Sequence, residues 1–150
     1  MSNFAVVGIK RHDNWSTPQD LFAELDAEFH FDDDPCPLYG KENGLDGLNR
    51  DWGARTFINP PYRRGEVDKW VEKAYIESRK GKVIVALLRL DPTTKWFREY
   101  IRDKAEVRLI CKRLRYGAAK RGAAFASMVV VWKGPPNLAD IIYERITRPG

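Results

Sequence analysis

Two periods of hydrophobic residues divide this chain into predicted strands and predicted helices. Residues 82–88 (KVIVALL) are almost continuously apolar, which is typical of a strand buried on both faces of a sheet. Residues 126–132 (ASMVVVW) follow the same pattern, and shorter apolar runs predict strands at 54–59 and 107–111. A further short strand is predicted at 30–36 (HFDDDPC), where it ends in acids.

Elsewhere, apolar residues recur every three or four positions, which indicates amphipathic helices. These helices are predicted at 16–29, 66–80, 93–104 and 138–145. In the first helix, Thr17 can serve as the cap, and Pro18 suits the first turn. Gly81 is expected to end the second helix.

The alternation of strand and helix predicts an α/β fold with a mainly parallel sheet. A length of 150 residues predicts one domain, with loose ends at 1–12 and 147–150. Ligands of such folds bind at the carboxyl ends of the strands. Two polar stretches fall there: the acids near Asp34, and the segment Asn59-Pro-Pro-Tyr62.

Composition narrows the class of protein. No run of eighteen apolar residues is present, and the first residues lack the pattern of a signal peptide, so we expect a cytoplasmic protein without a membrane span. Cys36 and Cys111 form no CxxC pair, so we expect reduced cysteines and no metal site. The net charge is +5, and residues 111–121 carry five basic side chains and no acid. Either a solvated loop or a nucleic-acid contact explains that run.

Asn59-Pro-Pro-Tyr62 has two interpretations. Proline has no N–H for a strand ladder, so the diproline could simply stop a strand. Alternatively, the segment positions an amine for attack: the Asn59 amide oxygen and the Pro60 carbonyl can accept the two N–H bonds of an adenine amine. Pro61 would keep the loop rigid, and Tyr62 offers a ring on which a flipped base can stack.

FINPPY (57–62) resembles the catalytic motif of amino-methyltransferases that use S-adenosylmethionine. Three further stretches, WSTPQDLFAELDAEFHFDDDPC, GLDGLNRDWGARTFINPPY and LLRLDPTTKWF, are similar to the compact phage and prophage DNA adenine-N6 methyltransferases. The resemblance covers residues 14–133 and implies a class I, Rossmann-like methyltransferase sheet, mostly parallel with an antiparallel last strand. Only about twenty residues separate Cys36 from Thr56, too few for two more strand–helix crossovers, so we predict a trimmed sheet.

The resemblance also implies roles for particular residues. Asn59 and Pro60 would orient the target amine, with Pro61 and Tyr62 completing the catalytic segment. The residues expected to bind S-adenosylmethionine are Trp15, Thr17, Pro18, Asp34, Cys36 and Asp46. For Thr17 a plain helix cap, for Trp15 a place in the core, and for Asp34 a solvated acidic turn stay open as alternatives.

Double-stranded DNA is the expected partner. The residues expected to contact it are Arg63, Arg64, Arg113, Arg115, Tyr116 and Lys120, with Lys95 and Arg98 as weaker candidates. A homodimer stays open. Three other functions also stay open: a methyltransferase of RNA adenine, a methyltransferase of protein glutamine, and a relative that binds DNA or cofactor with little turnover. The roles of Arg89 and Asp91 in LLRLDPTT are not assigned, because relatives tend to carry a proline there.

Overall fold

A computed structural model describes residues 16–37, 47–116 and 122–135 of the chain. Trp15, Asp46, Lys120 and the helix predicted at 138–145 lie outside these residues. The elements, in chain order, are α1 (Gln19–Phe29), the 3-10 helix η3 (Gly47–Asn49), β1 (Arg55–Ile58), α2 (Val67–Ser78), β2 (Val83–Arg89), α3 (Lys95–Tyr100), β3 (Glu106–Ile110) and β4 (Ser127–Lys133).

Four strands form one sheet in the order β1-β2-β4-β3. β1 pairs with β2 in parallel, with Ile58 opposite Ala86. β4 pairs antiparallel with both β2 and β3, so β1, β2 and β3 point the same way and β4 runs against them. The expected antiparallel last strand is therefore confirmed. Because β4 enters between β2 and β3, only one of the three ladders in the described chain is parallel.

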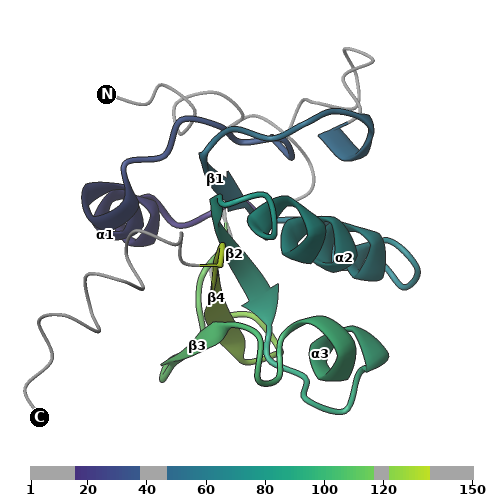
Figure 1. Cartoon of the computed structure of the whole chain (residues 1–150). Coiled ribbons are helices and arrows are strands. Elements are labelled where there is room, and N and C mark those ends of the chain that lie inside the picture. The colour runs from purple at the N-terminus through teal and green to yellow at the C-terminus, as the bar shows by residue number, and fades with distance from the viewer. Residues whose placement is uncertain (1–15, 38–46, 117–121, 136–150) are drawn as a thin grey trace, which may run out of the picture.

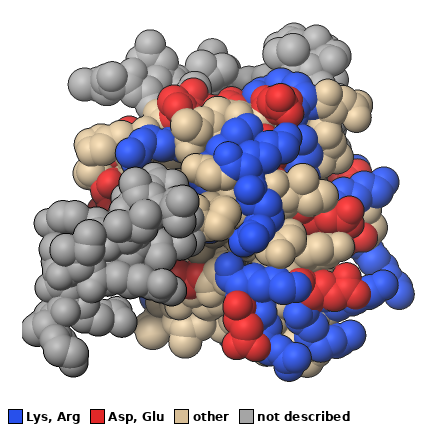
Figure 2. All heavy atoms as spheres, in the orientation of Figure 1, with Lys and Arg blue, Asp and Glu red and all other residues tan. Residues whose placement is uncertain are grey.

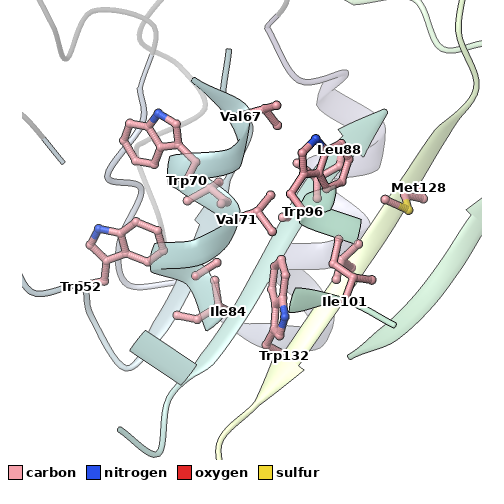
Figure 3. Packing of buried hydrophobic residues seen from close by; sticks show 14 residues of the cluster. Trp52, Val67, Trp70, Val71, Ile84, Leu88, Trp96, Ile101, Met128 and Trp132 are labelled. Carbon is pink, nitrogen blue, oxygen red and sulfur yellow. The ribbon is translucent and has the colours of Figure 1, made fainter. Parts of the chain in front are cut away.

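Helices cover both faces of this sheet, with α1 on one side and α2 and α3 on the other (Figure 1). Side chains alternate between the faces along β2: Val85 and Leu87 pack with residues of α1, whereas Ile84 and its alternate neighbours pack under α2 and α3. Figure 3 shows the second of these cores, in which Trp52, Trp70 and Trp132 surround the aliphatic side chains. Burial on both faces explains why β2 is apolar almost throughout.

Glu77, in the last turn of α2, holds the loop before β1 against this helix by hydrogen bonding. Its carboxylate is fully buried and accepts from Trp52 N at 2.8 Å, from Lys82 Nζ at 2.6 Å and from Lys80 Nζ at 2.6 Å. Lys73 lies 3.4 Å away. Burial works against ionisation, but the hydrogen bonds from Lys80 and Lys82 prevail and lower the pKa of Glu77 to about 2. The buried carboxylate is therefore ionised, and the neighbouring lysines balance its negative charge.

The predicted elements are largely confirmed, and two predictions are wrong in detail. The strand predicted at 30–36 is reduced to one parallel bridge between Asp33 and Thr56, because Pro35 has no N–H with which to extend the ladder. Thr17 does not cap α1: the N-cap position is Pro18, and no side-chain capping bond is formed. Thr94, by contrast, caps α3 through a bond from Phe97 N at 3.3 Å.

Positive charge is spread over the described part of one face of the molecule. Figure 2 shows Lys and Arg side chains over the middle and right of one face, where α2 and α3 lie in Figure 1, and Asp and Glu side chains are mixed among them. Within the described residues, no helix has the length and apolar character needed to cross a bilayer.

Candidate active site

The segment Asn59-Pro-Pro-Tyr62 leaves the sheet at the carboxyl end of β1. Thr56, Phe57 and Ile58 are buried, and Pro60 is buried as well, so the segment is held against the body of the protein. β2 continues past the last paired residue of β1. The Tyr62 hydroxyl reaches this extension and donates to the Leu87 carbonyl at 3.0 Å. The turn is therefore anchored to the neighbouring strand at the edge where α/β folds bind ligands.

Two hydroxyl groups orient the Asn59 amide. Its Nδ2 donates to Thr17 Oγ1 at 3.0 Å, and its Oδ1 accepts from the Tyr62 hydroxyl at 3.1 Å. The single hydroxyl hydrogen of Tyr62 is shared between Asn59 and the Leu87 carbonyl. The Thr17 side chain, which sequence reasoning allowed as a helix cap, thus holds the amide of the predicted catalytic residue.

An aromatic cluster formed by Tyr62, Tyr116 and Phe125 adjoins the amide. The Tyr62 ring meets Phe125 edge-on with centroids 5.4 Å apart, and meets Tyr116 edge-on at 6.3 Å. Tyr116 is only 2 % exposed, and its hydroxyl lies 2.8 Å from Ser127 Oγ. Burial raises the pKa of Tyr62 well above its usual value, so its hydroxyl stays protonated and can donate.

Phe125 and Ser127 were missed by sequence reasoning. Phe125 directly precedes the stretch 126–132 and Ser127 lies within it, and sequence reasoning predicted a strand there without assigning either residue to the site. The sequence offered only an aromatic residue and a hydroxyl residue just before an apolar run. This combination is common, so it does not identify a functional site. Only the pairing of β4 with β2, which sets Ser127 opposite Arg89, brings the two residues to the site.

The acids after Phe31 have separate roles. Asp33 accepts two bonds from Arg50, at 2.8 and 2.9 Å, and one from Gly53 N at 2.8 Å, so it is engaged in holding the loop before β1. Asp34 accepts from Cys36 N at 3.2 Å and forms no salt bridge with another described residue. Burial raises the pKa of Asp34 to about 7.

Asp34 is thus a half-buried carboxylate without a salt-bridge partner in the described chain, which suits a cationic ligand group such as an ammonium. Cys36 is also half-buried and packs against the core under α2. Asp33 is hydrogen-bonded to β1 through its backbone, with Phe57 N donating to Asp33 O at 3.0 Å. Asp34 therefore lies beside the end of β1 from which Asn59 emerges.

The described basic residues predicted to contact DNA are exposed. Arg63 and Arg64 follow Tyr62 directly, in the turn before α2. Arg113 and Arg115 flank Leu114, which is buried against the α1 side of the sheet. Tyr116 differs from these residues because it is buried, so it contacts the protein interior rather than open solvent.

The two weaker DNA candidates already have partners on or near α3. Arg98 Nη1 donates to the Thr93 carbonyl at 2.8 Å. Lys95 lies 3.6 Å from Glu99, one turn along the same helix. Such pairs are ordinary on an exposed helical face. Within the described residues, no group of three His, Cys, Asp or Glu side chains is placed to hold a metal ion.

Comparison with known proteins identifies relatives. The family model of the DNA N-6-adenine-methyltransferases (Dam) matches residues 7–137, a range that includes every predicted site residue. A protein of Escherichia phage T1 called DNA N-6-adenine-methyltransferase is 32 % identical over 107 residues, which cover 63 % of this chain and 43 % of that protein. The chain therefore matches less than half the length of this curated relative. No solved structure matches it significantly.

Proposed function

We propose that this chain, which belongs to the DNA N-6-adenine-methyltransferase family, transfers a methyl group from S-adenosylmethionine to the exocyclic N6 amine of adenine in DNA. The observation that carries the proposal is the fixed orientation of the Asn59 amide, between Thr17 and Tyr62, at the carboxyl end of β1. Preorganised hydrogen-bond acceptors of this kind accelerate a reaction by orienting the attacking group.

The Asn59 oxygen and the Pro60 carbonyl act as acceptors for the amine. An amide oxygen has two lone pairs, so Oδ1 can accept from Tyr62 and from a substrate N–H together. With both N–H bonds held, the nitrogen lone pair is directed away from the protein acceptors. Pro60 and Pro61 restrict the backbone, which keeps the two acceptors at a constant separation.

Adenine must leave the duplex to reach Asn59, because its amine is paired inside the helix. The aromatic cluster of Tyr62, Tyr116 and Phe125 supports an apolar surface next to the amide. We assign stacking on the flipped base to Tyr62 and support of the Tyr62 ring to Tyr116 and Phe125, since Tyr116 is buried. Arg63, Arg64, Arg113, Arg115 and Lys120 would contact phosphates.

S-adenosylmethionine supplies an electrophilic methyl group on a sulfonium. The residues near Asp34 suit its amino-acid end, because Asp34 is a half-buried carboxylate to which an ammonium can pair. Cys36 and Pro18 would complete the contacts, together with Trp15 and Asp46. Thr17 would lie between the cofactor and Asn59, since its hydroxyl already contacts the amide.

The sheet fits a trimmed version of the class I methyltransferase fold. Residues 31–33 lie beside β1, and the next strands across are β2, β4 and β3, with β4 antiparallel. Between residue 37 and β1, the described chain contains only the short helix η3 and no strand. We propose that the strands which usually extend the sheet beyond this edge are missing, and that the loop between Cys36 and β1 replaces them around the adenosine.

The test is a methyl-transfer assay with isotope-labelled S-adenosylmethionine. Unmethylated duplex DNA, RNA and total protein are offered in parallel, and the modified nucleosides or amino acids are identified by mass spectrometry. We expect labelled N6-methyladenine from DNA. The Asn59→Ala variant should lose it, whereas Gln19→Ala, which removes an exposed amide on α1, should keep it.

Other outcomes would identify the alternatives. Label in RNA or in protein glutamine would mean that the methyl transfer uses the same chemistry on a substrate other than DNA. No label in any polymer, with cofactor and DNA both bound by the folded protein, would indicate a binding relative without turnover. Activity retained in Asn59→Ala would refute the role given to the amide.

A further inference from the structure

Arg89 lies at the same edge of the sheet as Asn59 and has no assigned role. It is the last residue of β2, and it pairs with Ser127 across the ladder. Side chains alternate along a strand, so Arg89 continues the row of Val85 and Leu87, which faces α1 and the aromatic cluster. Its guanidinium therefore belongs on the face of the sheet that carries Tyr62 and Tyr116.

The Arg89 guanidinium is poorly compensated. Its Nε is buried, and in the part of the chain that the structure describes this nitrogen has no hydrogen-bond partner. Among the described residues its one ion pair is long: Nη2 lies 3.7 Å from Asp91 Oδ2. Asp91 is mainly engaged elsewhere, because its Oδ1 accepts from the Thr93 hydroxyl at 2.6 Å and from Thr93 N at 3.1 Å. An unsatisfied buried donor destabilises the folded state.

The same guanidinium is still accessible to a ligand and close to the site. The Arg89 side chain is 39 % exposed, so part of the guanidinium group is open to solvent while the Nε is buried. Its charge also acts on the Tyr62 hydroxyl: burial is the main influence and raises the pKa of Tyr62, whereas Arg89 works in the opposite direction. Tyr62 in turn donates to Asn59. Arg89 is therefore a cation beside the catalytic segment, and its guanidinium has donors available for a ligand.

We propose that Arg89 binds a backbone phosphate of the DNA strand next to the target adenine. This inference rests on the proposed function. The planar guanidinium presents adjacent donors that match two oxygens of a phosphate, and such charge-assisted pairs are among the stronger hydrogen bonds in proteins. A phosphate would pair with the solvent-exposed part of the guanidinium and balance the charge that the long pair with Asp91 leaves poorly compensated.

The position of Arg89 favours DNA over the carboxylate of the cofactor. Asp34, the residue suited to the cofactor's ammonium, follows the residue that bridges to β1 on the side away from β2. Arg89 ends β2, on the other side of β1. Two strand spacings amount to about 10 Å, so the two side chains lie on opposite sides of Asn59. The nucleotide that presents its amine to Asn59 from the β2 side would bring its own phosphates to Arg89.

The experiment measures DNA affinity as a function of salt. Fluorescence anisotropy with a labelled duplex of mixed sequence is recorded from about 50 to 300 mM salt for the wild type and Arg89→Met. Loss of one phosphate contact reduces the slope of log K against log salt by about 0.9, and we expect binding to weaken about tenfold at about 0.1 M salt. Arg89→Lys keeps the positive charge but loses the pair of adjacent donors. Its DNA affinity should therefore lie between that of the wild type and that of Arg89→Met.

Two controls separate this contact from other effects. Arg79→Met removes an exposed charge at the C-cap of α2, near the opposite end of β2, and should leave the slope unchanged. The melting temperature of Arg89→Met should equal or exceed that of the wild type, because the variant removes an unsatisfied donor. A clear loss of stability in Arg89→Met would show a structural role and overturn the proposal.

The remaining outcomes also decide the matter. If Arg89→Met binds S-adenosylmethionine more weakly and DNA normally, the guanidinium serves the cofactor and the proposal is wrong. If Arg79→Met changes the slope equally, only net charge matters and the proposal is wrong. A wild type that methylates DNA, with unchanged binding in Arg89→Met, refutes this inference alone. A wild type that binds DNA without methylating it refutes the proposed function, and a reduced slope in the variant then still supports the phosphate contact.

Discussion

The Thr17 hydroxyl accepts a hydrogen bond from Asn59 Nδ2 at 3.0 Å, across 42 positions of sequence. Thr17 precedes α1, and Asn59 follows β1, so this bond joins the start of the first helix to the predicted catalytic segment. The amide that should orient adenine is therefore positioned from outside its own loop.

Replacing Thr17 by Val keeps the shape of the side chain and removes the hydroxyl. We expect kcat to fall about tenfold, because small errors in orientation are costly in an attack that depends on positioning. The free energy of unfolding should fall by only about 1 kcal/mol, the usual contribution of one hydrogen bond. Steady-state kinetics and urea unfolding measure the two effects.

Thr17→Ser is the matched control, since serine retains the hydroxyl and should restore most of kcat. If Thr17→Val instead raised the KM for S-adenosylmethionine with kcat unchanged, Thr17 would act on the cofactor alone.

Tyr62→Phe separates the hydroxyl of Tyr62 from its ring. The hydroxyl donates to Asn59 and Leu87, while the ring packs on Phe125, and phenylalanine loses only the first. We expect about tenfold lower kcat and about 1 kcal/mol lower unfolding free energy. Tyr62→Ala should also weaken DNA binding, because the stacking surface is lost.

Tyr100→Phe is the control for both Tyr62 variants, because it removes an exposed hydroxyl bond between α3 and Glu72 of α2, on the face of the sheet opposite α1. An unchanged kcat in Tyr62→Phe would mean that Thr17 alone suffices to orient the amide.

Asp34 should make cofactor binding depend on pH. Its pKa is raised from 3.8 to about 7 by burial, so the carboxyl is largely protonated below pH 7 in the free protein. If the ionised form pairs with the ammonium, the affinity for S-adenosylmethionine should rise by up to about tenfold per pH unit below pH 7 and level off above it.

Calorimetry between pH 5.5 and 8.5 checks this dependence. Asp34→Asn should bind more weakly at pH 8 and show a flat profile, whereas Asp20→Asn, at an exposed position of α1, should follow the wild type. A steep profile that persists in Asp34→Asn would assign the titration to another group.

Glu77 should contribute to stability above acidic pH. Its pKa falls from 4.5 in the unfolded chain to about 2 in the folded protein. The unfolded state therefore binds more protons between these values, and the contribution of Glu77 is complete above about pH 4.5 and lost as the pH falls toward 2. Near neutral pH, Glu77→Gln should cost about 3 kcal/mol, because three lysines lose a buried partner.

Urea unfolding of both proteins from pH 2 to 7 measures the difference, which should shrink as the pH falls. Glu24→Gln, at an exposed position of α1, should show no such difference. A cost that is independent of pH would mean that packing around Glu77, and not its charge, stabilises the loop.

The sequence by itself determined most of the described elements and indicated a chemistry for one segment. Continuous apolar runs located β2 and β4 within one residue at each end, because burial on both faces of a sheet leaves few other choices of residue. Periodicity located α2, which was predicted at 66–80 and spans Val67–Ser78, together with its buried face. The diproline after β1 predicted a rigid polar turn, since proline constrains its own backbone whatever surrounds it.

Only the tertiary structure decided how distant residues meet. Thr17 contacts Asn59, and Arg89 faces Ser127, because β4 inserts between β2 and β3 and α1 lies over the sheet. Strand order and register depend on the packing of the whole core, and local periodicity does not specify them. For this reason the sequence identified the amide that we propose orients the substrate, whereas the side chains that hold this amide and the poorly compensated arginine beside it were identified only from the fold.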